Sequence, residues 1–358
     1  MTTATTKVGV LVINFGEPVE PTLEQVQPFL ERIFLQNAGL EPDESAVARA
    51  RQLARERTPS LIEEYETIGG SPLKAQADAQ AAALEAELRT RGHNARTYSA
   101  FQFVPPLVHE AVEQARSDGI DVLVALPVYP LCGKSTTEAA LDHVRAALDE
   151  LSWAPELLAL SGWHHHPAYV ALRADHIGDF VAERGLDLED ADTLLYFSVH
   201  GTPITYLEEG SRYDRYVEEH CRDIAARLGT DRYAVGFQNH TNRRVRWTQP
   251  DNEDRIREAA EKRLVVVPIS FMHEQSETLA ELDEGVRSFV EGLGKELHRV
   301  PVPHDSPRFH AALADLVGDM LAGPVADRLA RCRCVGGGRA WCTNGARDLP
   351  PSPYATAS

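Results

Sequence analysis

The chain has 358 residues and a mass of 39.5 kDa, which is enough for two domains that each bury a core. Lys and Arg total 36 against 54 Asp and Glu, so the formal net charge is -18. That charge would repel nucleic-acid phosphates and anionic membrane surfaces, and we expect neither as a partner. The sequence contains no apolar run of about 18 residues and does not begin like a signal peptide, so we expect no transmembrane segment and a cytoplasmic location.

Apolar runs of strand length alternate with amphipathic helical stretches such as Tyr213–Leu228 and Asp251–Lys262. The runs form two sets: Val8–Phe15, Thr97–Phe101, Val122–Tyr129 and Leu157–Leu160, then Thr193–His200, Tyr233–Phe237, Leu264–Phe271 and His298–Val302. Several are almost continuously apolar, which suits strands that are buried on both faces. The pattern predicts an α/β fold with two doubly wound, Rossmann-like domains built on parallel sheets.

The predicted domains are residues 7–165 and 166–322, joined near the polar stretch Trp163–Pro167. Residues 323–358 carry three cysteines among glycines and end in a Pro-, Ser- and Ala-rich tail, which predicts a short Cys-rich appendage. In doubly wound sheets, ligands bind beyond the carboxyl ends of the strands. Candidate site residues should therefore follow the predicted strand ends.

The segment Ser198–Pro203 reads Ser-Val-His-Gly-Thr-Pro and ends a buried strand with the imidazole of His200. The Gly and Pro that follow force a turn, which holds this His at the carboxyl edge of the strand. A neutral imidazole in that place could accept a proton near pH 7. A structural His whose ring is satisfied by hydrogen bonds is the alternative.

A second polar segment, Phe271–Glu284, also follows a buried strand. On an α-helix Glu277, Glu281 and Glu284 would occupy positions i, i+4 and i+7, which predicts three carboxylates on one face, with Glu274 one turn earlier. Like charges in this arrangement repel unless cations or solvent relieve them. The stack is therefore either an exposed polar face or a track for metal ions.

These two segments occur with several others in an order and spacing that resemble the ferrochelatase family, over about Val8 to Val317. The other motifs are Ile13–Pro18, Tyr65–Leu73, Tyr129–Pro130 with Ser135–Thr137, Phe237–Gln238 and Trp247. The resemblance implies a chelatase-like fold and a lyase activity. That activity is the insertion of Fe(II) into a porphyrin, either protoporphyrin IX or coproporphyrin III, in haem biosynthesis.

The resemblance implies that His200 and Glu277 are the catalytic residues and face each other across a cleft that holds the macrocycle. The ring is bent into a saddle, so that pyrrole nitrogens point out of plane and the metal enters as two N–H protons leave. His200 then accepts protons, and Glu277 is a second base or a transient iron ligand. Together with Glu281 and Glu284, they form the implied metal path for the iron substrate.

The resemblance also implies six substrate-binding residues: Phe15, Ile68, Ser71, Tyr129, Trp247 and Phe271. For the large rings, ordinary core packing is the alternative. Two positions depart from the family's pattern. Gln102 stands where a basic residue is usual, and Gln275 stands where a His is usual two residues before Glu277.

Cys332, Cys334 and Cys342 lie in a short Gly-rich segment and are one thiol short of a four-ligand site. Some ferrochelatases hold a 2Fe-2S cluster with C-terminal cysteines and one cysteine from the loop after the Tyr-Pro motif, and Cys132 lies in that loop here. The resemblance therefore implies a 2Fe-2S cofactor bound by these four residues. A tetrahedral zinc site and an uncoordinated tail are the alternatives. Cys221, inside a helical pattern, is predicted to be a packed core thiol.

The remaining expectations concern partners and competing functions. Porphyrin and ferrous iron are the expected substrates, and a homodimer or transient contacts with neighbouring haem-pathway enzymes are further expected partners. A cobalt or nickel chelatase for a more reduced tetrapyrrole, and a non-catalytic tetrapyrrole-binding or redox-sensing protein, are the competing functions. Consecutive residues seldom converge on one ion, so the sequence predicts solvent-exposed histidines at His164–His166.

Overall fold

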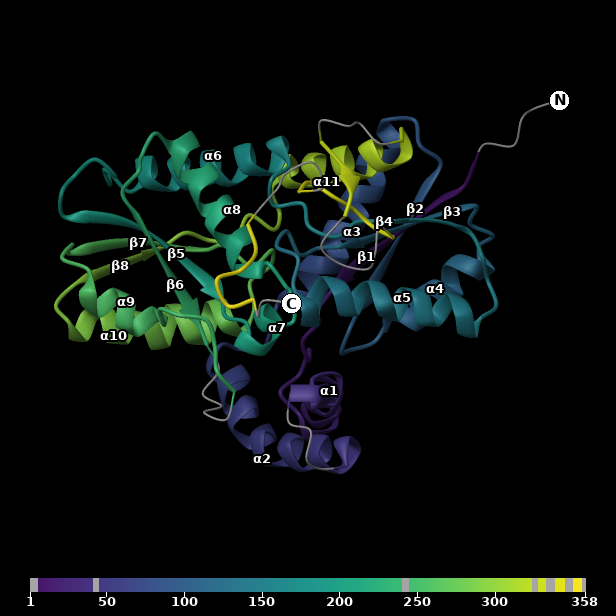
Figure 1. Ribbon diagram of the computed structural model, residues 1–358, viewed down its shortest axis with the longest axis horizontal. Coiled ribbons are helices and arrows are strands. Elements are labelled where there is room, and N and C mark those ends of the chain that lie inside the picture. Colours follow the sequence, from purple (N-terminus) through teal and green to yellow (C-terminus); the bar gives the residue numbers. More distant parts are fainter. Residues whose placement is uncertain are drawn as a thin grey trace. The chain divides into compact units, whose positions relative to one another are not determined.

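The computed structural model describes residues 6–40, 45–239, 245–323, 328–332, 339–344 and 350–355 (Figure 1). The chain divides into two compact units. Unit 1 comprises Met1–Trp163 and His304–Arg347, and unit 2 comprises His164–Pro303 and Asp348–Ser358. Each unit contains its own parallel sheet and its own covering helices.

Unit 1 is built on a four-stranded parallel sheet with the strand order β2-β1-β3-β4. Its strands are β1 (Val8–Asn14), β2 (Ala95–Phe101), β3 (Val122–Pro127) and β4 (Glu156–Ala159). Every residue of the central strand β1 is buried, which its continuous apolar run predicted. Asn14 pairs with Phe101 and Ile13 pairs with Pro127, so three strands end at the same edge of the sheet.

Unit 2 repeats this arrangement with the strand order β6-β5-β7-β8. Its strands are β5 (Thr193–His200), β6 (Tyr233–Gln238), β7 (Arg263–Pro268) and β8 (Glu296–Arg299). All three pairings are parallel. The predicted α/β fold with two parallel sheets is confirmed.

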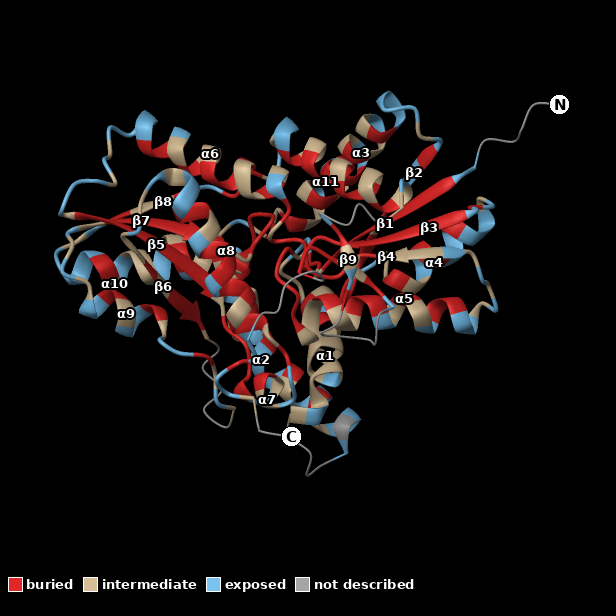
Figure 2. Cartoon of the chain, turned by 45° about the horizontal axis from the view of Figure 1, so that its top comes forward, coloured by how far each residue is buried: buried red, intermediate tan, exposed pale blue. Residues whose placement is uncertain are grey.

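Helices cover both faces of each sheet (Figure 1). In unit 1 these are α1 (Leu23–Gln36), α2 (Ala46–Thr67), α3 (Leu73–Thr90), α4 (Val108–Ser117), α5 (Ala139–Glu150) and α11 (Pro307–Leu321). In unit 2 they are α6 (Pro167–Glu183), α7 (Ile204–Glu208), α8 (Tyr213–Leu228), α9 (Asn252–Glu258) and α10 (Arg287–Gly292). Two short helices, η1 (Ala38–Leu40) and η2 (Lys134–Glu138), and the longer π-helix η3 (Glu277–Val286) complete the set. Figure 2 shows the central strands buried and the helices buried on one side.

The last long helix, α11, belongs to unit 1. The two domains predicted from the sequence are contiguous, and they place this helix in the second domain, residues 166–322. Helix α11 packs against α3, and Arg91 at the end of that helix forms an ion pair of 2.7 Å with Asp315. Periodicity identifies α11 as an amphipathic helix but carries no information about which sheet its apolar face covers. The boundary drawn from the sequence therefore differs from the spatial division.

The described stretches of the Cys-rich segment that contain Cys332 and Cys342 pack into the core of unit 1, whereas residues 350–355 belong to unit 2, where Ser352 Oγ donates to Asp214 at 2.9 Å. Strands β9 (Ala330–Arg331) and β10 (Trp341–Cys342) form an antiparallel pair, and Cys332 and Cys342 lie in a core cluster with β1, β3 and α5. The Thr343 amide donates to the Gly162 carbonyl at 2.9 Å. This part of the segment is thus an extension of the unit 1 core, whereas Cys334 lies outside the described residues.

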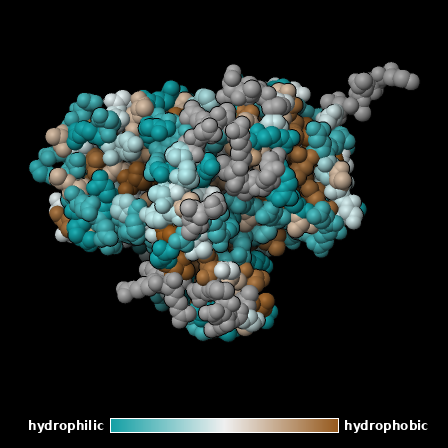
Figure 3. All heavy atoms as spheres, viewed as in Figure 1, coloured by the Kyte–Doolittle hydropathy of each residue, from teal (hydrophilic) through white to brown (hydrophobic). Residues whose placement is uncertain are grey.

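No helix in the described part of the chain combines the length and apolar character needed to cross a membrane. Figure 3 shows a mostly hydrophilic face, with apolar side chains gathered over α1 and α2 of unit 1. The exposed large apolar residues of that region are Val19, Leu23, Leu35 and Val47.

A buried ion-pair network fixes the chain between β7 and η3. Arg299, at the end of β8, donates to Glu274 at 2.8 Å and to Asp283 at 2.8 Å. Glu274 also accepts from the Val302 amide at 2.8 Å and from Thr278 Oγ1 at 2.6 Å. The Arg299 and Glu274 side chains are only 10% and 11% exposed, so each charge is stabilised mainly by the other and little by water.

We predict that Glu274→Ala lowers the free energy of unfolding by roughly 3 kcal/mol, because it leaves the buried charge of Arg299 with only one of its two carboxylate partners. Denaturant unfolding measures the loss. Asp192→Ala is the matched control, because Asp192 forms an exposed 3.1 Å ion pair with Lys262 whose loss should cost less than about 1 kcal/mol. Equal losses in the two variants would contradict an anchoring role for the buried network.

Candidate active site

The carboxyl ends of β5 and β7 lie at the point where the strand order of unit 2 reverses. The two strands are neighbours, and Ser198 pairs with Pro268. The register continues past β7, since the Ile269 amide donates to the Ser198 carbonyl at 3.0 Å. In doubly wound sheets the connections from two such strands leave toward opposite faces, which opens a crevice for ligands. His200 and Phe271, which follow these strand ends, lie at this position.

His200 is held at the end of β5 by contacts to its backbone. Its amide donates to Ser270 Oγ at 2.9 Å, and Tyr213 Oη donates to its carbonyl at 3.0 Å. The ring lies edge-on to Phe271, with centroids 6.1 Å apart. Burial lowers the pKa of His200 to about 4, because a desolvated imidazole resists protonation. The imidazole is therefore neutral at pH 7 and able to accept a proton or bind a metal ion.

The turn after His200 leaves no room for a side chain. A Cβ on Gly201 would lie 2.9 Å from the Gln238 carbonyl oxygen, and the Gly201 amide donates to the same oxygen at 2.7 Å. The next residues pair with a distant segment, because Pro203 forms a β-bridge with Trp247. The predicted residue Trp247 is thus brought to the strand end that carries His200.

Glu277 is the first residue of the π-helix η3 and is half-buried. Its carboxylate accepts hydrogen bonds from Gln275 Nε2 at 2.7 Å and from Ser276 Oγ at 3.2 Å. Two donors favour the ionised form of a carboxylate. Gln275, which departs from the family's pattern, therefore supplies a neutral donor to Glu277.

Gln238 joins the strand of His200 to the helix of Glu277, a role that the sequence analysis missed. It is the register partner of His200 on β6. Its side-chain oxygen accepts from Ser198 Oγ at 2.9 Å, and its nitrogen donates to the Glu277 carbonyl at 3.0 Å and to Glu281 Oε2 at 3.1 Å. The sequence signals at this position are a polar residue at the end of an apolar strand and the motif Phe237–Gln238, and neither indicates a contact with η3.

The three-carboxylate face expected of an α-helix is altered because η3 is a π-helix. Its i→i+5 hydrogen bonds widen each turn beyond the roughly 3.6 residues of an α-helix. Glu281 at i+4 stays near the face of Glu277, whereas i+7 no longer completes two turns, so Glu284 leaves that face. Both carboxylates are exposed, and Glu281 accepts a hydrogen bond from Gln238. Glu274 is also separate, since it belongs to the Arg299 ion pair.

The sequence pattern that describes ferrochelatases matches residues 7–321 of this chain. The chain belongs to the ferrochelatase family. The ferrochelatase of Synechococcus sp. (strain RCC307) is 34% identical over 335 residues, which cover 90% of this chain and 84% of that protein. The ferrochelatase of Geotalea uraniireducens (strain Rf4) is 31% identical over 318 residues, which cover 87% of this chain and 97% of that protein.

Among solved structures, SirB from Bacillus subtilis with Fe3+ has a TM-score of 0.53 to this chain at 10% sequence identity. The match covers 88% of this chain and 96% of SirB. At that identity the likeness concerns the fold alone. It confirms the chelatase-like α/β fold that the sequence resemblance implied.

Four of the predicted substrate-binding residues belong to unit 1, and they lie around the ends of β1 and β3. The Phe15 ring packs 4.5 Å from the Phe103 ring, and Ile68 contacts the same apolar cluster. Ser71 Oγ donates to the buried carboxylate of Glu17. Phe15 and Ile68 are half-buried and Ser71 is 9% exposed, so each combines packing or hydrogen bonding with some accessibility.

Tyr129 follows β3 and is hydrogen-bonded to Gln102, one of the two residues that depart from the ferrochelatase pattern. Its Oη donates to Gln102 Oε1 at 2.6 Å. The Gln102 backbone amide in turn donates to the Asn14 carbonyl at 3.0 Å, which fixes it beside the end of β1. The usual basic group is thus replaced by a neutral amide that orients a phenol.

The described cysteines are all buried and free of disulfides: Cys132, Cys221, Cys332 and Cys342. Burial raises the pKa of the Cys132 thiol well above its usual range, and the nearby Glu138 and Cys332 raise it further. Cys132 also lies beside Gly162, the residue to which the Cys-rich segment bonds. Three of the four predicted cluster ligands therefore lie in one region of unit 1, and the prediction that Cys221 is a core thiol is confirmed.

The prediction of solvent-exposed histidines before α6 is wrong. His164 and His166 are buried, and His165 is half-buried. The sequence shows three adjacent polar rings, but it does not show that acidic residues of α8 pack against them.

We predict that the His200 imidazole titrates with a pKa of about 4, well below the value of about 6.5 for an exposed His. The unfolded chain would bind the proton first, so stability falls as the pH drops through the interval between these two values. Histidine-labelled NMR spectra recorded from pH 8 to pH 4 measure the midpoint, with the resonance assigned by its loss in His200→Ala. A midpoint near 6.5 would contradict the desolvated, neutral state.

Proposed function

We propose that this chain inserts Fe(II) into a porphyrin, with His200 accepting pyrrole protons and Glu277 acting as second base or transient iron ligand. The reaction breaks two N–H bonds, forms four Fe–N bonds and releases two protons without a change of oxidation state. Membership of the ferrochelatase family supports the reaction. The observation that carries the residue assignment is that the backbones of His200 and Glu277 both meet Gln238: His200 is its register partner on β5, and the Glu277 carbonyl accepts a hydrogen bond from its side chain.

The two site residues suit different parts of the reaction. A neutral imidazole carries a nitrogen lone pair at pH 7, and a proton acceptor requires such a lone pair. Its low basicity also allows it to release the proton again before the next turnover. The Glu277 carboxylate, with donors from Gln275 and Ser276, is stabilised as an anion and can attract Fe(II). Glu281, bound to Gln238, extends the negative charge along the helix.

Bending of the macrocycle belongs to the same proposal. In a planar porphyrin the pyrrole N–H bonds lie in the ring plane, where neither a base nor a metal ion reaches them. Binding energy from contacts around the ring can supply the strain that tilts them outward. The proposed contacts are the six residues that the family resemblance implies: Phe15, Ile68, Ser71, Tyr129, Trp247 and Phe271.

We predict that His200→Ala and Glu277→Gln each reduce the rate of Fe(II) insertion to about a hundredth or less, since proton transfer by a positioned group contributes about 10²–10⁴-fold. Porphyrin affinity should stay within about tenfold, because neither change removes much apolar contact. Turnover is followed by the absorbance of the metalloporphyrin, and binding by fluorescence quenching.

His298→Ala and Glu296→Gln are the matched controls for these two substitutions. These residues form a more exposed His–carboxylate pair of 3.3 Å in the same unit, at β8. Both controls should insert Fe(II) at the parental rate. Parental turnover in His200→Ala or Glu277→Gln would disprove the role of that residue.

We also propose that Cys132, Cys332, Cys334 and Cys342 bind a 2Fe-2S cluster. Burial keeps the Cys132 thiol protonated unless a cation stabilises its thiolate, and bound iron would do so. Such a cluster would join the loop after β3 to the β9–β10 segment. Zinc held by the same four thiolates is the second candidate, because four cysteines suit either centre.

We predict that protein purified without oxygen is reddish brown and contains about two iron and two sulfide per chain. Cys332→Ser or Cys342→Ser should remove the colour, whereas Cys221→Ser should retain it, because Cys221 is a core thiol of unit 2. Iron, sulfide and zinc analysis together with visible spectra distinguish the outcomes. A colourless protein with one zinc would replace the cluster by zinc, and colour that persists in Cys132→Ser would remove Cys132 from the ligand set.

Several finer properties remain predictions within this proposal. They are the choice between protoporphyrin IX and coproporphyrin III, a homodimer or transient contacts with neighbouring haem-pathway enzymes, and a cytoplasmic location. Turnover measured on the two porphyrins separates the substrates, because the rings differ in having two or four carboxylates.

A further inference from the structure

A second group of potential metal ligands lies in unit 2, and it shares no residue with the His200 and Glu277 site. It is formed where the segment just before α6 meets α8. On α8, Glu219 and Asp223 are four residues apart and therefore project from the same face of the helix. His165 lies against that face and is hydrogen-bonded through Nδ1 to the Asp223 carboxylate.

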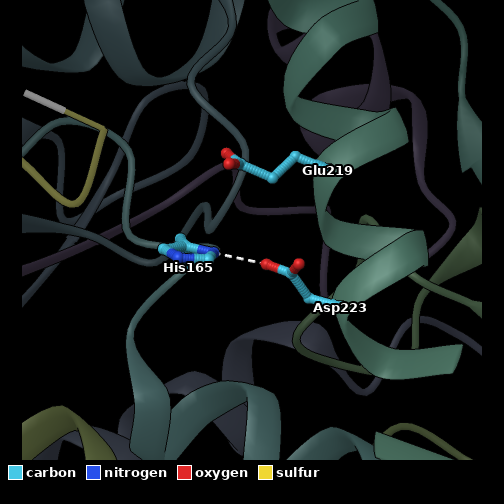
Figure 4. A group of neighbouring side chains, drawn as sticks. All are labelled: His165, Glu219 and Asp223. Atoms are coloured by element: carbon cyan, nitrogen blue, oxygen red, sulfur yellow. Dashed lines mark hydrogen bonds and ion pairs between the residues drawn. The ribbon is translucent and has the colours of Figure 1, made fainter. Parts of the chain in front are cut away.

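The three side chains converge closely enough to share one ion. One ligand atom each of His165, Glu219 and Asp223 lies within 4.8 Å of the others, and the described residues contain no second trio of His, Cys, Asp or Glu as compact as this one. Figure 4 shows the Glu219 and Asp223 carboxylates extending from successive turns of α8 toward the His165 ring. A small inward movement would bring all three atoms to the distances of about 2.0–2.2 Å at which His and carboxylates bind zinc.

Buried residues hold the Glu219 carboxylate in place. His164 Nε2 is hydrogen-bonded to Glu219 Oε2 at 2.9 Å, and both side chains are at most 2% exposed. The His164 ring packs against the rings of Tyr216 and His220, at 5.3 Å and 5.8 Å between centroids. Metal-binding carboxylates are commonly oriented by such a second layer of hydrogen bonds.

The two carboxylates of this group lie close together in a partly enclosed place. Glu219 is 2% exposed and lies 3.9 Å from the guanidinium of Arg222, which is itself 58% exposed. The same guanidinium lies 3.6 Å from Asp223. An exposed Arg contributes little at these distances, and a divalent cation between the two carboxylates would add a close counter-charge.

We propose that His165, Glu219 and Asp223 bind one divalent transition-metal ion, such as Zn(II) or Fe(II). One imidazole and two carboxylates favour these ions over Mg(II) and Ca(II), which prefer all-oxygen sites. Three protein ligands leave a position open for water. The side chains of His165 and Asp223 are 21% and 19% exposed, so the ion exchanges with solvent. Once bound, it fastens the start of α6 to α8.

Zn(II) binding to the full-length protein tests the proposal. Equilibrium dialysis and calorimetry should show one fewer Zn(II) per chain, or at least tenfold weaker binding at one site, in both His165→Ala and Asp223→Asn. Zn(II) should raise the melting temperature of the parent more than that of either variant, because an ion that binds only the folded state stabilises it. His109→Ala, which removes an exposed His next to Glu150, should bind Zn(II) as the parent does.

Activity separates this site from the proposed catalytic one. With Fe(II) in excess, both variants should insert iron within about twofold of the parental rate, because neither residue belongs to the His200 and Glu277 site. Asp223→Asn preserves the size of the side chain, and it decides the question if His165→Ala fails to fold. Unchanged Zn(II) stoichiometry, affinity and thermal shift in Asp223→Asn would overturn the proposal and leave His165 and Asp223 as a simple ion pair.

Discussion

Parallel pairing of β5 with β7 is the contact on which the geometry of the candidate active site depends. The pairing is in register from Thr193–Arg263 to Ser198–Pro268, and it joins two strands that are buried along most of their length. A slip of one residue would exchange the side chains between the two buried faces and disrupt their packing, so core packing fixes the register. His200 and the chain leading to Glu277 leave the sheet at the same edge as a result. The chemistry is thus positioned by a core interaction that contains no catalytic group.

A chain of buried hydrogen bonds connects the paired strands to the polar residues of the candidate site. Tyr196 donates to Asn252 at 3.0 Å, Asn252 donates to Ser198 at 2.8 Å, and Ser198 donates to Gln238 at 2.9 Å. Because the Ser198 proton is used in this way, the amide nitrogen of Gln238 must face η3. Gly236 makes room for the chain, since a Cβ there would lie 2.6 Å from Asn252 Oδ1. A fully satisfied network of this kind specifies one arrangement, whereas a broken one would leave buried groups unpaired.

The sequence predicted the strands well and the local chemistry less completely. Near-continuous apolar runs such as those of β3 and β7 identify buried parallel strands, and a polar residue at the end of such a run identifies a candidate site residue, as for His200. The π-helix could not be foreseen, because Glu277 and Glu281 fit an i→i+4 spacing equally well, and the choice depends on tertiary contacts such as that of Gln238. The environment of His164–His166 was missed for a related reason. Their burial depends on α8, which lies about fifty residues later in the chain.

The two units use the same strand order for different kinds of chemistry. In unit 1 the ends of β1 and β3 present the Phe15 ring and the hydrogen-bonded pair Tyr129 and Gln102, which are apolar or neutral groups. In unit 2 the corresponding ends of β5 and β7 lead to an imidazole and a carboxylate, which can exchange protons or bind a cation. A crevice at the reversal of strand order is a property of the fold and carries no chemistry by itself. The side chains placed at that reversal therefore decide what it can do: apolar and neutral groups suit packing against a flat ring, whereas an imidazole and a carboxylate suit the exchange of protons or the binding of a cation.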